Sequence, residues 1–246
     1  KRLNWPDDYF QFMATSNYQV YMMKDWAYFL VNNGTCHNVN LELLFQRNSI
    51  DNPLYTRRGS QFSLSVAATP PYSLWDGKDY GAMDDQDPDK FKLIEYYKWK
   101  FKAKIFSPLA PMTVKRTPVL MTRVEYGFLG SYDNNKRSPF ETFYMGGYST
   151  TYATETIGLR GYENGSIAGN GGYSSYGYAY SRLSMELRYP FILEPSSTIY
   201  GLVFVEAGNA WKSIKEFNPF NLKRSAGVGV RIFLPMIGLM GIDWAY

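Results

Sequence analysis

Hydrophobic and polar residues alternate one by one along most of this chain. The clearest case is YKWKFKAKI, residues 97–105, in which every second residue is a lysine. An extended strand places these lysines on one side and the aromatic and aliphatic residues between them on the other. A row of ammonium groups needs water or partners, so this strand is predicted to have one polar and one apolar face. The lysines are Lys98, Lys100, Lys102 and Lys104.

The same period of two recurs from end to end, and helical periodicity is nearly absent. It predicts nine strands: 8–23, 38–48, 60–69, 96–106, 119–132, 175–190, 198–208, 224–234 and 238–246. Strands in soluble sheets average about 5–6 residues, whereas a tilted membrane-spanning strand needs about 9–11. The predicted lengths therefore favour a membrane-spanning sheet.

The connections between these strands alternate in length. Those at 107–118, 190–197 and 235–237 are short, and 49–59 is intermediate. Those at 24–37, 70–95, 133–174 and 209–223 are longer and polar or glycine-rich. Short turns at one end and long loops at the other are typical of an outer-membrane barrel. Tryptophans near the strand ends fit its interfacial girdles: Trp26, Trp75, Trp99, Trp211 and Trp244.

The predicted fold is therefore all-β, a transmembrane antiparallel β-barrel in which 1–246 forms one barrel domain. Lipid offers no hydrogen bonds, so such a sheet must close on itself, and bacterial single-chain barrels have even numbers of strands. Nine strands predict that further strands belong to the barrel at both ends of this segment. A large soluble β-sandwich stays open as the alternative fold. It has to explain charges and glycines in the middle of every polar face.

Composition removes several classes of function. A net charge of +4 is too small to indicate a nucleic-acid-binding surface. One cysteine and one histidine exclude a disulfide framework and a Cys/His zinc site within this chain. Cys36 and His37 are neighbours that point to opposite faces of a strand, which argues against a nucleophile and its base. We therefore expect no enzyme activity, cofactor or metal.

The glycine-rich stretch ETIGLRGYENGSIAGNGGYSSYGYAY, residues 155–180, carries a single cation, Arg160. It lacks the Gly-Lys-Ser/Thr of a phosphate-binding loop and no helix follows it, so a nucleotide site is not expected. Elsewhere DDQDPDK, 84–90, spaces aspartates at alternate positions. It lacks the glycine and terminal glutamate of a calcium loop, so a solvated outer loop is the better interpretation.

Charges on the polar faces are the remaining candidates. Glu206 shares its face with Tyr200, Leu202 and Phe204, and a carboxylate in that partly apolar setting needs a cation. An arginine on a loop that folds inward, such as Arg160, would supply bidentate hydrogen bonds to Glu206 or to Glu186 on the preceding strand. A scatter of separate charges in a water-filled lumen is the alternative. The other lumen candidates are Lys98, Lys100, Lys102, Lys104, Arg182, Arg188, Arg231 and Asp243.

Several longer motifs carry a family resemblance across essentially the whole chain. They are RLNWPDDYFQF (2–12), QRNSIDNPLYTRRGSQFSLSV (46–66), FYMGG (143–147), LRGY (159–162), SRLSMELRYPF (181–191), FVEAGNAW (204–211), SAGVGVRIFLPMIG (225–238) and GIDWAY (241–246). Together they resemble the C-terminal barrel of the BamA family, in the surface-antigen/POTRA-barrel superfamily. These proteins are central subunits of the outer-membrane β-barrel assembly machinery.

The resemblance implies a sixteen-stranded barrel of which this chain supplies strands seven to fifteen. The family's periplasmic POTRA domains, strands one to six and strand sixteen have no counterpart here. The 119–132 and 175–190 segments then resemble strands eleven and twelve, and 133–174 resembles the sixth extracellular loop. By the same resemblance Arg160, Gly161 and Tyr162 form the loop-six motif. Its arginine would pair with Glu186 and Glu206 inside the lumen.

The expected function is that of an outer-membrane protein insertase in a Gram-negative bacterium. Expected partners are unfolded client outer-membrane proteins, accessory BAM-type lipoproteins, periplasmic chaperones, and outer-membrane lipid and lipopolysaccharide, with no nucleic acid. Three alternatives remain. One is a TamA-like assembly factor or a two-partner secretion translocator of the same superfamily. Another is a passive porin-like channel with the lysines of 97–105 as an anion-selective strip. The last is a soluble binding module.

Overall fold

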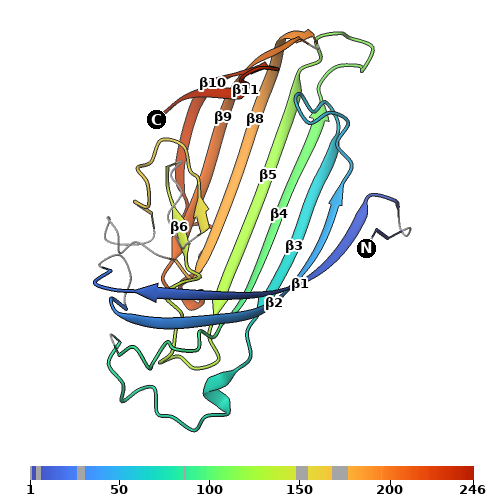
Figure 1. Cartoon of the computed structure of the whole chain (residues 1–246). Helices are drawn as coiled ribbons and strands as arrows, with labels where there is room; N and C mark the ends of the chain where they lie inside the picture. The colour runs from blue at the N-terminus through green and yellow to red at the C-terminus, as the bar shows by residue number, and fades with distance from the viewer. Residues whose placement is uncertain are drawn as a thin grey trace.

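The computed structural model describes residues 2–3, 7–26, 31–85, 87–147, 155–167, 177–194 and 196–246. These residues form one curved, open antiparallel sheet of nine strands, ordered in space as in the chain (Figure 1). The strands are β1 (Phe10–Met23), β2 (Gly34–Asn48), β3 (Gly59–Ala68), β4 (Tyr97–Pro108), β5 (Val119–Gly130), β8 (Ala179–Glu194), β9 (Ser197–Trp211), β10 (Lys223–Leu234) and β11 (Gly238–Ala245). The predicted all-β fold and its nine strands are confirmed, with ends that differ by a few residues.

Side chains alternate between an inner and an outer face of this sheet. Along β9, Val203 and Val205 on the outer face are 55% and 52% exposed. Phe204 and Glu206, between and beside them on the inner face, are 1% and 2% exposed. The outer face is thus apolar and uncovered, as contact with lipid requires, and the polar residues lie inside. Within the described ranges no helix has the length and apolar content needed to cross a membrane.

From β3 onward the connections alternate in length as the sequence predicts. The first connection, predicted at 24–37, is no longer than 49–58, because β2 already begins at Gly34. At one end of the sheet the strands are joined by 49–58, 109–118, 195–196 and 235–237, and at the other by 24–33, 69–96, 131–178 and 212–222. The connection predicted at 190–197 is shorter than expected, because β8 continues to Glu194. The register of β8 against β9 shifts between Pro190 and Ile192. This irregularity lets the strand pass a proline, which has no N–H for the ladder.

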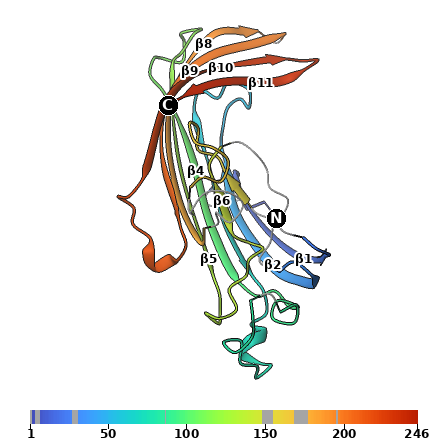
Figure 2. The same cartoon turned by 90° about the vertical axis from the view of Figure 1, so that its left-hand side faces the viewer.

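In its described parts, 131–147, 155–167 and 177–178, the longest connection turns back along the inner face (Figure 2). It contains a feature that the alternation did not predict, a parallel pair of short strands, β6 (Phe143–Met145) and β7 (Glu155–Ile157). Three residues are too few to show a period. Six of its apolar side chains are buried and join side chains of the wall in one core: Phe140, Phe143, Met145, Ile157, Leu159 and Ile167. The loop is therefore a packed part of the interior.

Glycine in the wall makes room for this loop. A Cβ atom on Gly127 of β5 would lie 2.2 Å from the Tyr180 ring and 2.8 Å from the Phe143 ring. These two rings pack edge to face with centroids 4.7 Å apart, so neither moves alone. The sheet and its returning loop thus approach each other closely at this mid-strand glycine.

Gly127→Ala is expected to lower the free energy of unfolding by about 1–3 kcal/mol, the usual cost of overpacking. Urea unfolding in detergent micelles, followed by the heat-modifiable shift in gel mobility, measures it. Thr122→Ala on the outer face of the same strand is the matched control and should change little. Equal losses for the two variants would mean that the loop does not rest on Gly127.

Candidate functional site

Arg160 lies on the returning loop and is buried at the inner face, with 4% of its surface exposed. Bridges between Gly147 and Leu159 and between Met145 and Ile167 hold the loop on either side of it. The next residue, Gly161, has φ +83°, a conformation that residues with a Cβ rarely adopt. This turn brings the backbone against the wall, where a Cβ on Gly161 would lie 3.3 Å from that of Ser225.

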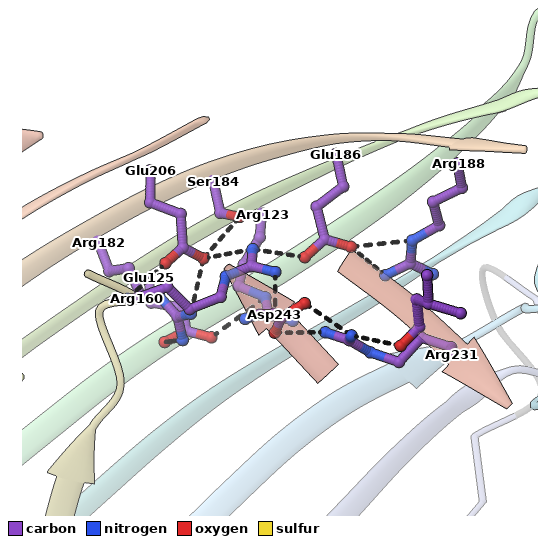
Figure 3. Close-up of polar contacts among 11 residues, drawn as sticks. Arg123, Glu125, Arg160, Arg182, Ser184, Glu186, Arg188, Glu206, Arg231 and Asp243 are labelled. Carbon is purple, nitrogen blue, oxygen red and sulfur yellow. Dashed lines mark hydrogen bonds and ion pairs between the residues drawn. The ribbon is translucent and has the colours of Figure 1, made fainter. Parts of the chain in front are cut away.

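The guanidinium of Arg160 reaches two carboxylates on neighbouring strands (Figure 3). Its Nη2 donates to Oε1 of Glu186 on β8 at 2.7 Å and to Oε1 of Glu206 on β9 at 2.8 Å. The backbone N–H of Arg160 donates to the other oxygen of Glu206 at 3.0 Å. The Arg160 Cζ also lies 3.5 Å from the centroid of the Phe204 ring. Charge-assisted bonds and the cation–π contact together offset the burial of this cation.

Each carboxylate is shared with a second arginine from the wall. Arg182 Nη2 donates to Oε1 of Glu206 at 2.9 Å, and the Ser184 hydroxyl donates to the same oxygen at 3.1 Å. Arg188 donates to Oε2 of Glu186 through Nε at 2.9 Å and through Nη2 at 2.6 Å. Side chains of β8 therefore hold both acids in addition to the loop.

A third acid extends the cluster to the last two strands. Asp243 on β11 accepts two bonds from Arg231 on β10, both of 2.7 Å. Its Oδ2 lies 3.7 Å from Nη1 of Arg160. Arg160 thus links one loop to carboxylates on β8, β9 and β11.

A further pair, Arg123 and Glu125 on β5, borders the cluster. Arg123 Nε lies 3.8 Å from Oε1 of Glu125, and Arg182 Nη1 lies 3.9 Å from its Oε2. Five cations then face four carboxylates, so the cluster is close to neutral. The cations are Arg123, Arg160, Arg182, Arg188 and Arg231, and the anions are Glu125, Glu186, Glu206 and Asp243.

The other predicted residues lie on the inner face but outside this cluster. Tyr162 is partly buried against the loop core and donates its hydroxyl to the carbonyl of Arg224 at 2.8 Å. The Nζ of Lys98 lies 3.5 Å from Oε2 of Glu141 on the returning loop and 4.7 Å from the centroid of the Phe143 ring. The remaining three lysines of β4 are half-buried along the same wall, at Lys100, Lys102 and Lys104.

Sequence reasoning did not include Arg123, Glu125, Ser184 and the stacking ring of Phe204 in this site. Each lies at a strand position for which the alternation predicts an inward-pointing side chain, so its orientation could be predicted from the sequence. Their proximity depends on register, which pairs Arg123 with Ser184 and Ser184 with Glu206 across three strands. No local pattern encodes that register.

The cluster has the chemistry of a structural clamp. Both oxygens of Glu206 and both of Glu186 accept bonds from protein donors, which leaves neither carboxylate placed to take a proton from a substrate. Over the described ranges no group of three or more His, Cys, Asp or Glu residues is arranged to hold a metal ion.

Comparisons with known proteins agree with this architecture. The family model described as the Omp85 superfamily domain matches residues 7–246. The crystal structure of BamA from Haemophilus ducreyi lacking POTRA domains 1–3 is similar to this chain, with a TM-score of 0.67 and 18% sequence identity. The match covers 98% of this chain and 48% of that one, so this chain spans about half the length of its structural relative. A search of curated proteins finds no match. This chain belongs to the Omp85 superfamily of outer-membrane β-barrel proteins, and it has the fold of a BamA-type barrel wall.

Proposed function

We propose that this chain forms part of the barrel of an outer-membrane protein insertase, which folds client barrels and inserts them into the membrane. The observation that carries the proposal is the loop fastened to the inner wall through Arg160, Glu186 and Glu206. Family membership supports a role in outer-membrane protein assembly or transport. The proposed partners are unfolded client barrels, periplasmic chaperones and accessory lipoproteins in the outer membrane of a Gram-negative bacterium.

The proposed mechanism uses no covalent chemistry. Unpaired strand edges at the seam of the complete barrel accept an incoming client strand. A narrow apolar belt thins the bilayer nearby and lowers the cost of insertion. The clamp contributes rigidity, because it keeps a long loop fixed while the seam exchanges partners.

A passive anion-selective pore is the competing function, and the lysine row of β4 was its main support. Lys98 has an acidic partner in Glu141 and lies over the ring of Phe143, both on the returning loop. A loop packed against that wall reduces the free lumen that a porin requires. A TamA-like assembly factor or a two-partner secretion translocator would belong to the same superfamily, and we expect the same clamp in either.

Reconstitution of the full-length protein into liposomes tests the insertase proposal. A urea-unfolded client barrel should fold faster there than in empty liposomes, as seen by heat-modifiable gel mobility. Arg160→Ala should slow this folding because the loop loses its fixed position, and Arg57→Ala in the 49–58 turn should not. Client folding at the rate of empty liposomes would contradict the proposal. A large, steady, anion-selective conductance would support the porin instead.

A further inference from the structure

The loop between β9 and β10, residues 212–222, lies on the opposite side of the wall from the returning loop. Its Phe217 ring has its centroid 5.1 Å from that of Phe128 and 4.7 Å from that of Trp211. Both partner rings lie on the outer face. Trp211 is an even number of residues from the outward-pointing Val205 on β9, and Phe128 is next to the inward-facing Gly127 on β5. Figure 2 shows this loop projecting from the outer side of the sheet.

The loop is built to hold that position. Ser213 caps the short 3-10 turn η3 (Ile214–Glu216) by accepting the N–H of Lys215. The Asn209 side chain, on the outer face of β9, donates to the carbonyl of Asn221 at 2.8 Å. Phe217 then covers the outward aromatic residues at the loop end of β5 and β9. Two other apolar side chains stay uncovered: Phe220 is 89% exposed and Ile214 is 40% exposed.

Cations flank these exposed apolar residues along the chain. The segment 212–224 carries four, all exposed, and a single acid, Glu216, so its net charge is +3. The cations are Lys212, Lys215, Lys223 and Arg224. Aromatic side chains beside lysine and arginine are the pattern of a membrane–water interface, where rings enter the acyl layer and cations meet phosphates.

We propose that the segment 212–224 is a binding site for phosphorylated lipid headgroups of the outer leaflet. Phe220 and Ile214 insert at the edge of the acyl layer, and the four cations bind headgroup phosphates. Lipid is the occupant because the segment rests on the lipid-facing side of the barrel wall and its charge complements that of phosphate. The site needs only the barrel's place in a membrane, so it is independent of the insertase proposal.

Fluorescence of a labelled variant tests the site. Phe220→Cys is labelled with an environment-sensitive dye, and Cys36, which is fully buried, stays unlabelled. The protein is reconstituted into phosphatidylcholine vesicles with increasing fractions of phosphatidylglycerol and with lipids that carry a quencher in the acyl chain. Quenching is expected to rise with the anionic lipid. Arg224→Gln should shift the half-maximal fraction upward by about fivefold, the loss expected for one cation.

Lys115→Gln is the matched control, because its side chain is 84% exposed but lies in the 109–118 turn at the other end of the sheet. It should leave the titration unchanged, and heat-modifiable mobility checks that every variant is folded. If inorganic phosphate changed the dye fluorescence as much as phosphatidylglycerol does, the segment would be a free-anion site and the proposal would be overturned. A dye that stays in water at every lipid composition would also overturn it.

Discussion

Replacing Arg160 with alanine is expected to lower the free energy of unfolding by about 3 kcal/mol, the lower end of the cost of breaking a buried ion pair. The guanidinium is 4% exposed and bridges Glu186 and Glu206. Its removal takes a cation from two buried carboxylates at once. The cost stays near the lower end because each acid keeps a second arginine, Arg188 or Arg182.

Urea unfolding in detergent micelles measures this loss, and proteolysis of the 131–178 loop reports whether the loop leaves the wall. Arg160→Lys should recover only part of the stability, because an ammonium lacks the second nitrogen that faces Asp243 and the flat guanidinium that stacks on Phe204. Arg57→Ala is the matched control. Its pair with Asp51 spans 3.7 Å and is about one-third exposed at the arginine, so it should cost under about 1 kcal/mol. Arg160→Ala with wild-type stability and a protected loop would contradict the clamp.

Glu206→Gln is expected to be the more damaging change, at about 4 kcal/mol. The carboxylate accepts bonds from the backbone and side chain of Arg160, from Arg182 and from Ser184. An amide removes the negative charge that Arg160 and Arg182 share. It also turns an N–H donor toward other donors, so at least one bond becomes a repulsive contact.

Glu186→Gln is the natural comparison for this variant. Glu186 accepts from Arg160 through one oxygen and from the more exposed Arg188 through the other. Glu186→Gln should lower the free energy of unfolding by about 2 kcal/mol, the value of a charge-assisted hydrogen bond. The same urea titration ranks the two. A loss at Glu186 equal to or above that at Glu206 would contradict the ranking predicted from the additional bonds that Glu206 accepts.

Strand positions and faces could be predicted from the sequence because they depend on local alternation. Each residue of a strand points opposite to its neighbours, so the pattern around Lys98 or Glu206 gives the face without any knowledge of the partners. The contrast between short and long connections likewise follows from antiparallel order. The family resemblance added the pairing of Arg160 with two glutamates, which the pattern alone left as one of two alternatives.

The sequence by itself determined a wall of long amphipathic strands with Arg160 in a glycine-rich loop. The tertiary structure decided which inner charges meet. It joined Asp243 and Arg231 to the cluster, paired β6 with β7, and placed the described parts of 131–178 on the inner side and 212–222 on the outer side. The physical reason is the range of the interactions. The face on which a side chain lies follows from alternation between neighbouring residues of one strand. Register, loop direction and ion pairing depend on residues of other strands, which are far away in the sequence.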